Sequence, residues 1–279
     1  MKLFANNLYI VSTPIGNLGD ITLRALEVLK KSDIILCEDT RHSIKLLSHY
    51  KIKKKLIPYH KFNEKKQLAN IIQYFNQGKI LSLISDAGTP LLSDPGRFLV
   101  NQCVENGIKV TPIPGVSSIT SALSVSGFSD KFLFYGFLPK TENKLEKVLA
   151  SLSKNSYTQV FFIPSKKINF YIKGFKKFFS GRKIIIAKEI TKMHEAFVRD
   201  DINKIKMFKN PIKGELTIVV SENIIKVKKF DEEKIVNKVK KYLEKYSLKD
   251  TVSLILETEK INKKKIYDIC LKIKNEKIY

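Results

Sequence analysis

The sequence is poor in the residues that build metal centres and disulfide frameworks: it has three cysteines and four histidines among 279 residues. Cys37, Cys103 and Cys270 lie far apart among apolar neighbours, an odd number without the spacing of a disulfide framework. We therefore expect three reduced cysteines with structural roles. The histidines also lack metal-ligand spacing, so no metal is expected.

Long hydrophobic runs are missing too. None approaches the roughly 18 residues that a membrane span needs. The first residues, MKLFANN, lack the apolar core and the small-residue cleavage site of a secretory signal. We therefore expect no membrane partner and a cytoplasmic location. Hydrophobic residues still make up 43% of the chain, which is enough for two domains, or two and a small appendage, with buried cores.

Arginine is scarce, although the chain is strongly basic. The net charge is +24, with the larger excess in the C-terminal half. Basic side chains bind nucleic acids by releasing counterions from phosphates. However, nearly all of them here are lysines, which lack the bidentate fork of the guanidinium group. Charge alone therefore leaves two interpretations equally open: a nucleic-acid partner and a compositional bias.

Four short apolar runs in the N-terminal half each end in a loop of small, polar and turn-forming residues. The runs cover residues 8–11, 33–37, 80–84 and 109–113, and the loops that follow read STPIGNLGD, EDTR, SDAGTPLLSDPG and PGVSS. Helical patterns alternate with the runs, which predicts parallel strands with helical crossovers. Because the carboxyl ends of such strands meet at one edge of a sheet, the sequence predicts one shared pocket.

The chemistry of that pocket is narrowed by elimination. The loops contain neither a P-loop nor the spacing of a dinucleotide fingerprint, and no serine lies in a nucleophile elbow. Gly88 lets the backbone approach a ligand closely, which favours a neutral or zwitterionic small molecule held by main-chain groups. For Asp94 we favour loop capping, and for Asp86 capping and binding stay equally open.

Further patterns divide the chain into three parts. In the first part, Asp20 is expected to cap a helix that ends at Lys31, and more helices are expected at 41–50, 64–76, 98–106 and 117–126. The second part has strand patterns at 131–137, 159–163, 183–188 and 215–220, with helices at 142–152 and 168–179. Three lysine-rich helices follow a charged linker at 222–230.

We therefore predict an N-terminal α/β domain over residues 1–127, a second α/β domain over 128–225 and a C-terminal helical domain over 230–279. The last is helix-turn-helix-like, and it either binds nucleic acid or serves as a packing appendage.

Several long motifs resemble those of one known family. They are YIVSTPIGNLGDITLRA at 9–25, EDTR at 38–41 and the loop at 85–96, extended by PGVS at 114–117, FYGFLP at 134–139 and EITKMHE at 189–195. The chain resembles, over residues 7–222, the bacterial enzymes that 2′-O-methylate the ribose of a cytidine in the decoding region of 16S ribosomal RNA. These enzymes belong to the tetrapyrrole-methylase superfamily.

The resemblance implies two tetrapyrrole-methylase-like α/β domains with S-adenosyl-L-methionine in the cleft between them, a small C-terminal helical domain, a homodimer, and 16S ribosomal RNA in the small subunit as partner. It also implies site residues. Those for the cofactor are Pro14, Asp86, Ala87, Gly88, Thr89, Leu92, Ser117, Ser118, Phe162 and Ile163. The candidates for a catalytic base are Glu189, His194 and Glu195. The candidates for RNA binding are Arg41, Lys166, Lys167 and Lys192.

For the three candidate bases, and for Lys192 and Arg41, a purely structural role is at least as well supported by the residues alone. The chain also departs from its relatives, which often carry YESPHR where residues 162–167 read FIPSKK. Lys166 and Lys167 can replace a phosphate contact of the missing His and Arg but not a carboxylate.

Two other functions stay open. One is a methyltransferase of the same fold that acts on a tetrapyrrole or another small molecule. The other is a basic RNA-binding assembly factor without a cofactor. The basic balance and the close match at 13–24 and 85–96 favour the ribosomal RNA enzyme.

Overall fold

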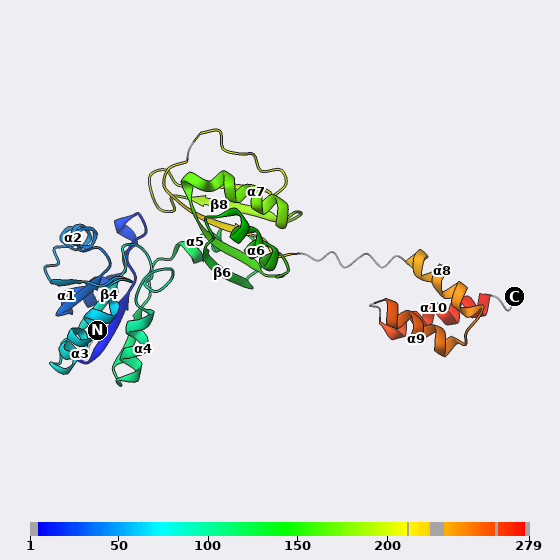
Figure 1. The fold of residues 1–279 in the computed structure, drawn as a ribbon, viewed down its shortest axis with the longest axis horizontal. Coiled ribbons are helices and arrows are strands. Elements are labelled where there is room, and N and C mark those ends of the chain that lie inside the picture. Colours follow the sequence, from blue (N-terminus) through cyan, green and yellow to red (C-terminus); the bar gives the residue numbers. More distant parts are fainter. Residues whose placement is uncertain (1–4, 211, 224–231, 260–261, 277–279) are drawn as a thin grey trace. The chain divides into compact units, whose positions relative to one another are not determined.

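The chain forms two compact units, residues 1–224 and 225–279, in a computed structural model that describes residues 5–210, 212–223, 232–259 and 262–276 (Figure 1). The larger unit contains two five-stranded sheets with helices packed against them, and the smaller one consists of helices. The predicted α/β class with a helical C-terminal region is confirmed.

The first sheet is entirely parallel and has the strand order β3-β2-β4-β1-β5. Its strands are β1 (Asn7–Val11), β2 (Ile34–Cys37), β3 (Lys55–Pro58), β4 (Leu81–Ile84) and β5 (Lys109–Ile113). One face packs against α1 (Leu23–Lys31) and α2 (Thr40–His49), and the other against α3 (Glu64–Asn76) and α4 (Arg97–Glu105). Because both faces are buried, the central strands are continuously apolar rather than alternating.

The strand order decides which loops can form a site together. β4, β1 and β5 are neighbours, so the loops at their carboxyl ends emerge side by side. β2 lies on the other side of β4, between β3 and β4, so its loop emerges beside the β3 and β4 loops and away from those of β1 and β5.

The second sheet is mixed and has the order β6-β7-β10-β8-β9. Its strands are β6 (Phe132–Phe137), β7 (Thr158–Pro164), β8 (Lys183–Lys188), β9 (Ala196–Asp201) and β10 (Glu215–Val220). Only β6 and β7 pair in parallel. The helices α6 (Glu142–Ser153) and α7 (Ile168–Phe178) cover one face. The short α5 (Ser118–Ser124), which follows the first sheet in the chain, packs on the other face and so links the two sheets.

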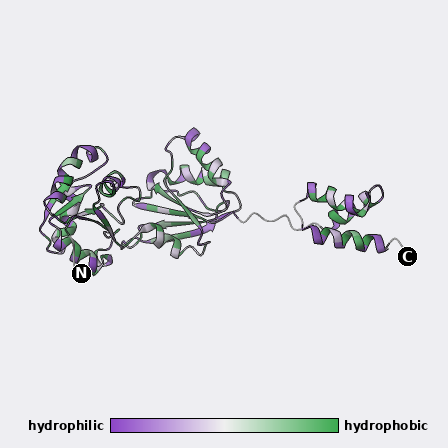
Figure 2. Ribbon diagram, turned by 90° about the horizontal axis from the view of Figure 1, so that it is seen from below, coloured by the Kyte–Doolittle hydropathy of each residue, from purple (hydrophilic) through white to green (hydrophobic). Residues whose placement is uncertain are grey.

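Figure 2 shows the hydrophobic residues concentrated along the strands and on the helix faces that pack against them, with hydrophilic residues on the outer helix turns. The smaller unit follows the same principle. Its helices α8 (Glu232–Leu243), α9 (Leu248–Thr258) and α10 (Lys263–Glu276) share a core that includes Ile235, Val239, Val252, Ile266 and Ile273. Among the helices described, none is both long enough and apolar enough to span a membrane.

The sequence patterns located most elements within a few residues, with three exceptions. Asp20 was expected to cap the first helix, but Leu18–Asp20 form a 3-10 turn and Thr22 caps α1, accepting from the Ala25 N–H at 3.0 Å. The strands β3 and β9 were not predicted, because both are edge strands with only partial apolar character. The linker predicted at 222–230 lies almost wholly outside the described residues.

The core of the second sheet generates a prediction about stability. The rings of Phe161, Phe175 and Phe179 are fully or almost fully buried and pack against one another, with 5.5 Å between the centroids of Phe161 and Phe175. Phe175→Ala is expected to lower the free energy of unfolding by about 3–5 kcal/mol, because it leaves a cavity. Urea unfolding measures this loss. Phe62→Ala is the control, since Phe62 is 94% exposed, and a similar loss there would contradict the explanation.

Candidate active site

A cavity of about 370 Å³ lies between the carboxyl ends of β4, β1 and β5 and the second sheet. Its lining includes nine of the ten residues that the resemblance implies for the cofactor: Asp86, Ala87, Gly88, Thr89, Leu92, Ser117, Ser118, Phe162 and Ile163. The structure thus brings together residues from segments far apart in the sequence. Pro14, the tenth, lines a neighbouring cavity instead.

Hydrogen bonds tie the three loops of the first sheet to one another. Thr13 and Gly88 exchange two backbone hydrogen bonds, of 2.9 and 3.0 Å. The Thr89 hydroxyl is 2.9 Å from that of Ser12, and it donates to the Val116 carbonyl at 3.2 Å. Gly88 has a φ of +79°, a conformation that side chains with a Cβ rarely adopt. The loops after β1, β4 and β5 therefore form one wall.

The β4 loop is held in a strained conformation where it enters the cavity. Leu91 and Ser93 both have positive φ values, +72° and +76°, although neither is a glycine. A Cβ at Gly136, beside the irregularity in β6, would lie 3.1 Å from the Ser93 hydroxyl, so the loop lies close against the second sheet. Strain of this kind costs on the order of 1–3 kcal/mol per residue and is concentrated at functional sites.

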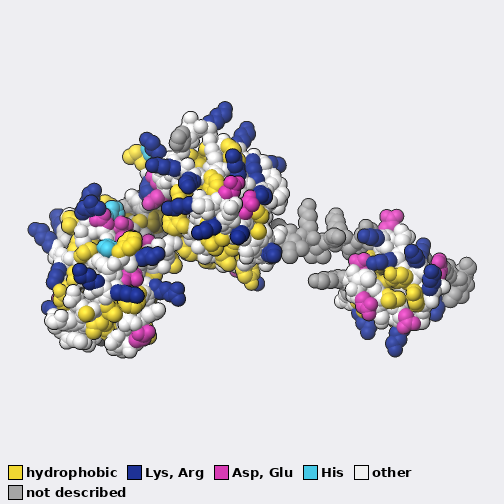
Figure 3. All heavy atoms as spheres, in the orientation of Figure 1, with side chains coloured by type: hydrophobic (Ala, Val, Ile, Leu, Met, Phe, Trp, Pro, Cys, Tyr) yellow, Lys and Arg dark blue, Asp and Glu magenta, His cyan; other side chains and the backbone are white. Residues whose placement is uncertain are grey.

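The charge of the first cavity is opposite to that of the protein. Figure 3 shows Lys and Arg side chains spread over the visible surface, as expected for a net charge of +24. The cavity lining nevertheless contains three acidic residues, Asp86, Asp94 and Glu215, and no lysine, arginine or histidine. Partial burial and the nearby charge of Glu38 raise the pKa of Asp94 to about 6. Asp94 forms no ion pair with any of the described residues, so its charge is left for a ligand.

A second cavity, of about 270 Å³, shares part of this wall. Four residues line both cavities: Ile15, Asp86, Ala87 and Glu215. The rest of the second lining comes from the β1 loop, from α2 and from the second sheet, and it includes Pro14, Gly16, Leu18, His42, Lys45, Leu46 and Lys192. The second cavity therefore has basic groups that the first lacks.

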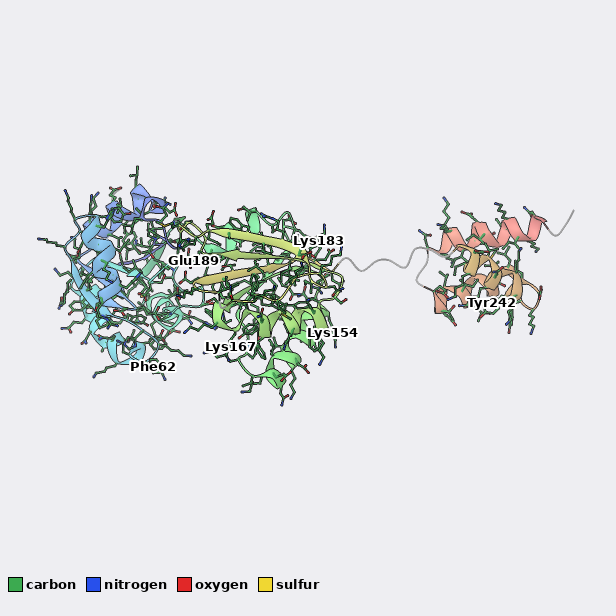
Figure 4. All side chains as sticks on the ribbon, turned by 90° about the horizontal axis from the view of Figure 1, so that it is seen from above. Phe62, Lys154, Lys167, Lys183, Glu189 and Tyr242 are labelled. Carbon is green, nitrogen blue, oxygen red and sulfur yellow. The ribbon has the colours of Figure 1, made fainter. Side chains whose placement is uncertain are left out.

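Glu189 and Lys192 connect the second sheet to the β1 loop. The Lys192 ammonium lies 3.1 Å from a Glu189 oxygen and 2.9 Å from a Glu215 oxygen, and these carboxylates raise its pKa against the effect of burial. Glu189 also accepts the Glu215 N–H at 2.8 Å, which lowers the pKa of Glu189. Figure 4 shows Glu189 at the junction of the two sheets. The Thr191 hydroxyl accepts the Asn17 N–H at 3.1 Å, a further link to that loop.

The remaining candidates lie outside both cavities. None of the three candidate bases, Glu189, His194 and Glu195, belongs to either lining. His194 is exposed, and the Glu195 carboxylate accepts the Thr191 N–H at 2.6 Å. Lys166 and Lys167 are exposed just after β7, in a 3-10 turn (η2, Ser165–Lys167).

Arg41 is also exposed and outside both cavities. Its guanidinium pairs with Asp39 at 2.7 Å, and this contact lowers the pKa of Asp39 to about 2.

Sequence reasoning missed several residues of the two linings. Asp94 was favoured as a loop cap, but it faces the first cavity. His42 directly follows the EDTR motif, yet nothing in the sequence places it against Asp86. The segment Gly214–Thr217 lines the first cavity from β10, a strand that was predicted without a site. Of these, only Asp94 carried a local signal, because it lies in the loop that was singled out.

The pKa of Asp94 leads to a prediction about pH. Its folded-state pKa, about 6, lies above the ordinary value of 3.8, so the stability it contributes is full below about pH 4 and is lost as the pH rises through 6. A pKa shift of this size corresponds to a change of at most about 3 kcal/mol in the free energy of unfolding. Because Asp94 is partly exposed, we expect a change of roughly 1 kcal/mol. Asp94→Asn should therefore be the more stable protein at pH 7 by about this amount.

The measurement is denaturant unfolding of both proteins between pH 4 and 7.5. The difference in unfolding free energy should shrink toward pH 4. A difference that does not depend on pH would show that the Asp94 charge is not the cause.

The sequence pattern of the tetrapyrrole (corrin/porphyrin) methylases matches residues 7–206. A protein of Thermotoga maritima called ribosomal RNA small subunit methyltransferase I is 43% identical over 218 residues, which are 77% of this chain and 97% of that protein. A protein with the same name from Mesomycoplasma conjunctivae is 47% identical over 76% of this chain and 89% of its own length. Another, from Buchnera aphidicola, is 40% identical over 97% of this chain and 98% of its own length.

Solved structures show the same fold at low sequence identity. A cobalt precorrin-4 methyltransferase matches with a TM-score of 0.56 and 17% identity, over 77% of this chain and 95% of its own. A diphthine synthase matches with a TM-score of 0.56 and 16% identity, over 77% of this chain and 90% of its own.

Proposed function

Because the chain belongs to the tetrapyrrole (corrin/porphyrin) methylase family, and within it to the ribosomal RNA small subunit methyltransferase I proteins, we propose that it methylates 16S ribosomal RNA with S-adenosyl-L-methionine as donor. The position we propose is the ribose 2′-hydroxyl of a cytidine in the decoding region. This choice rests on the resemblance of residues 9–25 and 85–96 to the enzymes that carry out that reaction. It also implies a cytoplasmic protein that acts on the small subunit.

The observation that carries the proposal is the charge of the first cavity. The lining has no basic side chain, and two of its three carboxylates, Asp86 and Asp94, are not paired with a lysine or arginine of the described chain. In a protein of net charge +24 this favours a cationic ligand and disfavours a phosphate-bearing one. S-adenosyl-L-methionine carries a sulfonium and an ammonium group. Its apolar and uncharged parts fit the rest of the lining, and the volume is typical of a small-molecule site.

The residues of the cavity suggest how the donor would be held. The open backbone at Ala87, Gly88 and Thr89 suits its amino-acid and sugar parts, and Ser117 and Ser118 add hydroxyls from the β5 loop. Phe162 and Ile163 line the cavity from β7 and would shield a bound donor from water. When bound, the donor supplies a methyl group that its positive sulfur already activates, so the chain's main task is in-line placement of the acceptor.

The RNA partner is supported by the basic surface, because lysines gain affinity for phosphates by counterion release. Lys166 and Lys167 are exposed close to β7, where they can reach phosphates, although the Lys167 ammonium also lies over the Phe170 ring, 6.0 Å from its centroid. We also propose a homodimer. The edge strand β6 exposes the side chains of Phe132 and Tyr135, aromatic residues of the kind that is enriched at subunit interfaces.

The direct test is methyl transfer from radiolabelled S-adenosyl-L-methionine to small ribosomal subunits from a strain that lacks this gene. Nuclease digestion and mass spectrometry then locate the methyl group. Label on a cytidine ribose of 16S ribosomal RNA is the expected result. Transfer to tetrapyrrole precursors but not to subunits would favour the alternative acceptor. No binding of S-adenosyl-L-methionine in calorimetry would exclude both enzymes.

A substitution at Gly88 tests where the donor binds. Gly88→Val puts a branched side chain at the cavity wall, where even the Cβ would lie only 3.2 Å from the Ile15 side chain. The substitution should abolish measurable affinity for S-adenosyl-L-methionine in calorimetry. Gly107→Val is the matched control. Gly107 has a similar positive φ of +69°, but a Cβ there meets open space. Equal affinity in the two variants would place the donor elsewhere.

Removal of residues 231–279 tests the helical unit. We expect the affinity for small subunits to fall at least about tenfold, or about 1.4 kcal/mol, because many lysines are lost. The affinity for S-adenosyl-L-methionine should not change, since every residue of the first cavity lies in the larger unit. Unchanged turnover on subunits would instead identify the unit as a packing appendage.

A further inference from the structure

The second cavity has the position and the charge expected of an acceptor site. It lies beside the first cavity, and the shared residues Asp86 and Ala87 form the wall between them. Three basic residues, His42, Lys45 and Lys192, line only this cavity. The carboxylates of Glu189 and Glu215 already neutralise Lys192. Lys45, in contrast, makes no ion pair within the described part of the chain, so its charge is available to a phosphate.

His42 and Lys45 face the cavity together because of helix geometry. They are three residues apart on α2, which places both side chains on one face of the helix. Asp39 at the N-cap fixes the start of α2 by accepting the Arg41 N–H at 2.8 Å. The helix therefore presents an imidazole and an ammonium group to the same space.

The Asp86 carboxylate lies behind the imidazole. His42 Nδ1 is 4.0 Å from Asp86 Oδ1, and the same oxygen accepts the Asp39 N–H at 3.2 Å. This hydrogen bond fixes Asp86 between the β2 and β4 loops. A carboxylate on the Nδ1 side holds a histidine with Nε2 free to accept a proton, and such contacts often tighten only when substrate binds.

We propose that the second cavity receives the target nucleotide of the RNA and that His42 is the catalytic base for its ribose hydroxyl. Asp86 is the positioning residue behind His42, and Lys45 binds a phosphate next to the target. This inference rests on the function proposed above. It assigns the donor to the first cavity, which has no basic side chain, and the acceptor to the second, where Lys45 is available for a phosphate.

In the transfer step the hydroxyl oxygen forms a bond to the methyl carbon while the bond between that carbon and the sulfur breaks. The electron pair of the broken bond stays on the sulfur, which becomes a neutral thioether. The hydroxyl proton moves to His42 Nε2, and the imidazolium later releases it to water. No further reactant is needed, and the charge balances.

Other titratable groups near the two cavities are less suited to this role. Asp94 lines only the first cavity, where its charge faces the proposed donor. Lys192 and Glu215 neutralise each other across the second cavity. Arg41 is paired with Asp39, away from both linings. His42 is thus the one imidazole in the described lining of the second cavity.

The test compares His42→Gln with His49→Gln, a histidine on the same helix that lines neither cavity. His42→Gln should lower kcat on small subunits by about 100-fold or more. The affinities for S-adenosyl-L-methionine and for subunits, measured by calorimetry and filter binding, should stay within about threefold. His49→Gln should retain full kcat. Imidazole in the buffer should restore part of the activity of His42→Ala.

Two further variants separate the other roles. Asp86→Asn keeps an oxygen for the Asp39 N–H but loses the charge behind the imidazole, so kcat should fall while subunit affinity is unchanged. Lys45→Met should weaken subunit binding and reduce the slope of log affinity against log salt by about 0.7, the value for one phosphate of a single strand.

The outcomes distinguish this inference from the proposed function. If the wild-type protein does not methylate subunits, the proposed function fails. If the wild type is active and His42→Gln keeps its kcat, the base is another group and this inference is overturned. If Lys45→Met changes neither the affinity for subunits nor the slope of log affinity against log salt, Lys45 does not bind a phosphate.

Discussion

The site depends on one pair of backbone hydrogen bonds, those that Thr13 and Gly88 exchange between the β1 and β4 loops. Because the two residues are joined through their main chains, the residues that follow Thr13 and precede Gly88 are fixed relative to one another. These include Ile15, Asp86 and Ala87, which line both cavities. The bonds require the left-handed conformation of Gly88, so a single glycine supports the shared wall.

The distribution of charge follows from this wall. The proposed donor and acceptor have opposite electrostatic needs, since one is cationic and the other carries phosphates. Asp86 and Glu215 line both cavities, but Asp94 lines only the first, and the basic residues His42, Lys45 and Lys192 line only the second. The acidic lining of the first cavity costs stability, because Asp94 is partly buried there and its pKa is raised. A carboxylate with a raised pKa that lines a cavity marks a candidate binding site.

Much of the fold could be read from the sequence, because periodic patterns and turn residues are local signals. The limits of α3, β8 and β10 agree with the predicted ones. The shared pocket was predicted from loops at strand ends, and three of the four predicted loops do line the first cavity. The fourth, after β2, does not, because the strand order places β2 between β3 and β4, away from β1 and β5. Strand order depends on long-range pairing, which no local pattern encodes.

The same limit explains the role that the structure gives to the motif EITKMHE. Its Glu189 and Lys192 form an ion pair, and a Cβ at Gly16 would clash with Lys192 while one at Gly214 would clash with Glu189. The pair thus packs directly against the backbones of the β1 loop and the segment before β10. A carboxylate that accepts hydrogen bonds from a lysine and a backbone N–H, and whose pKa is lowered, is a weak base. It is better suited to a structural role. The geometry therefore favours a clamp between the two sheets, which fixes Glu215 at the edge of both cavities.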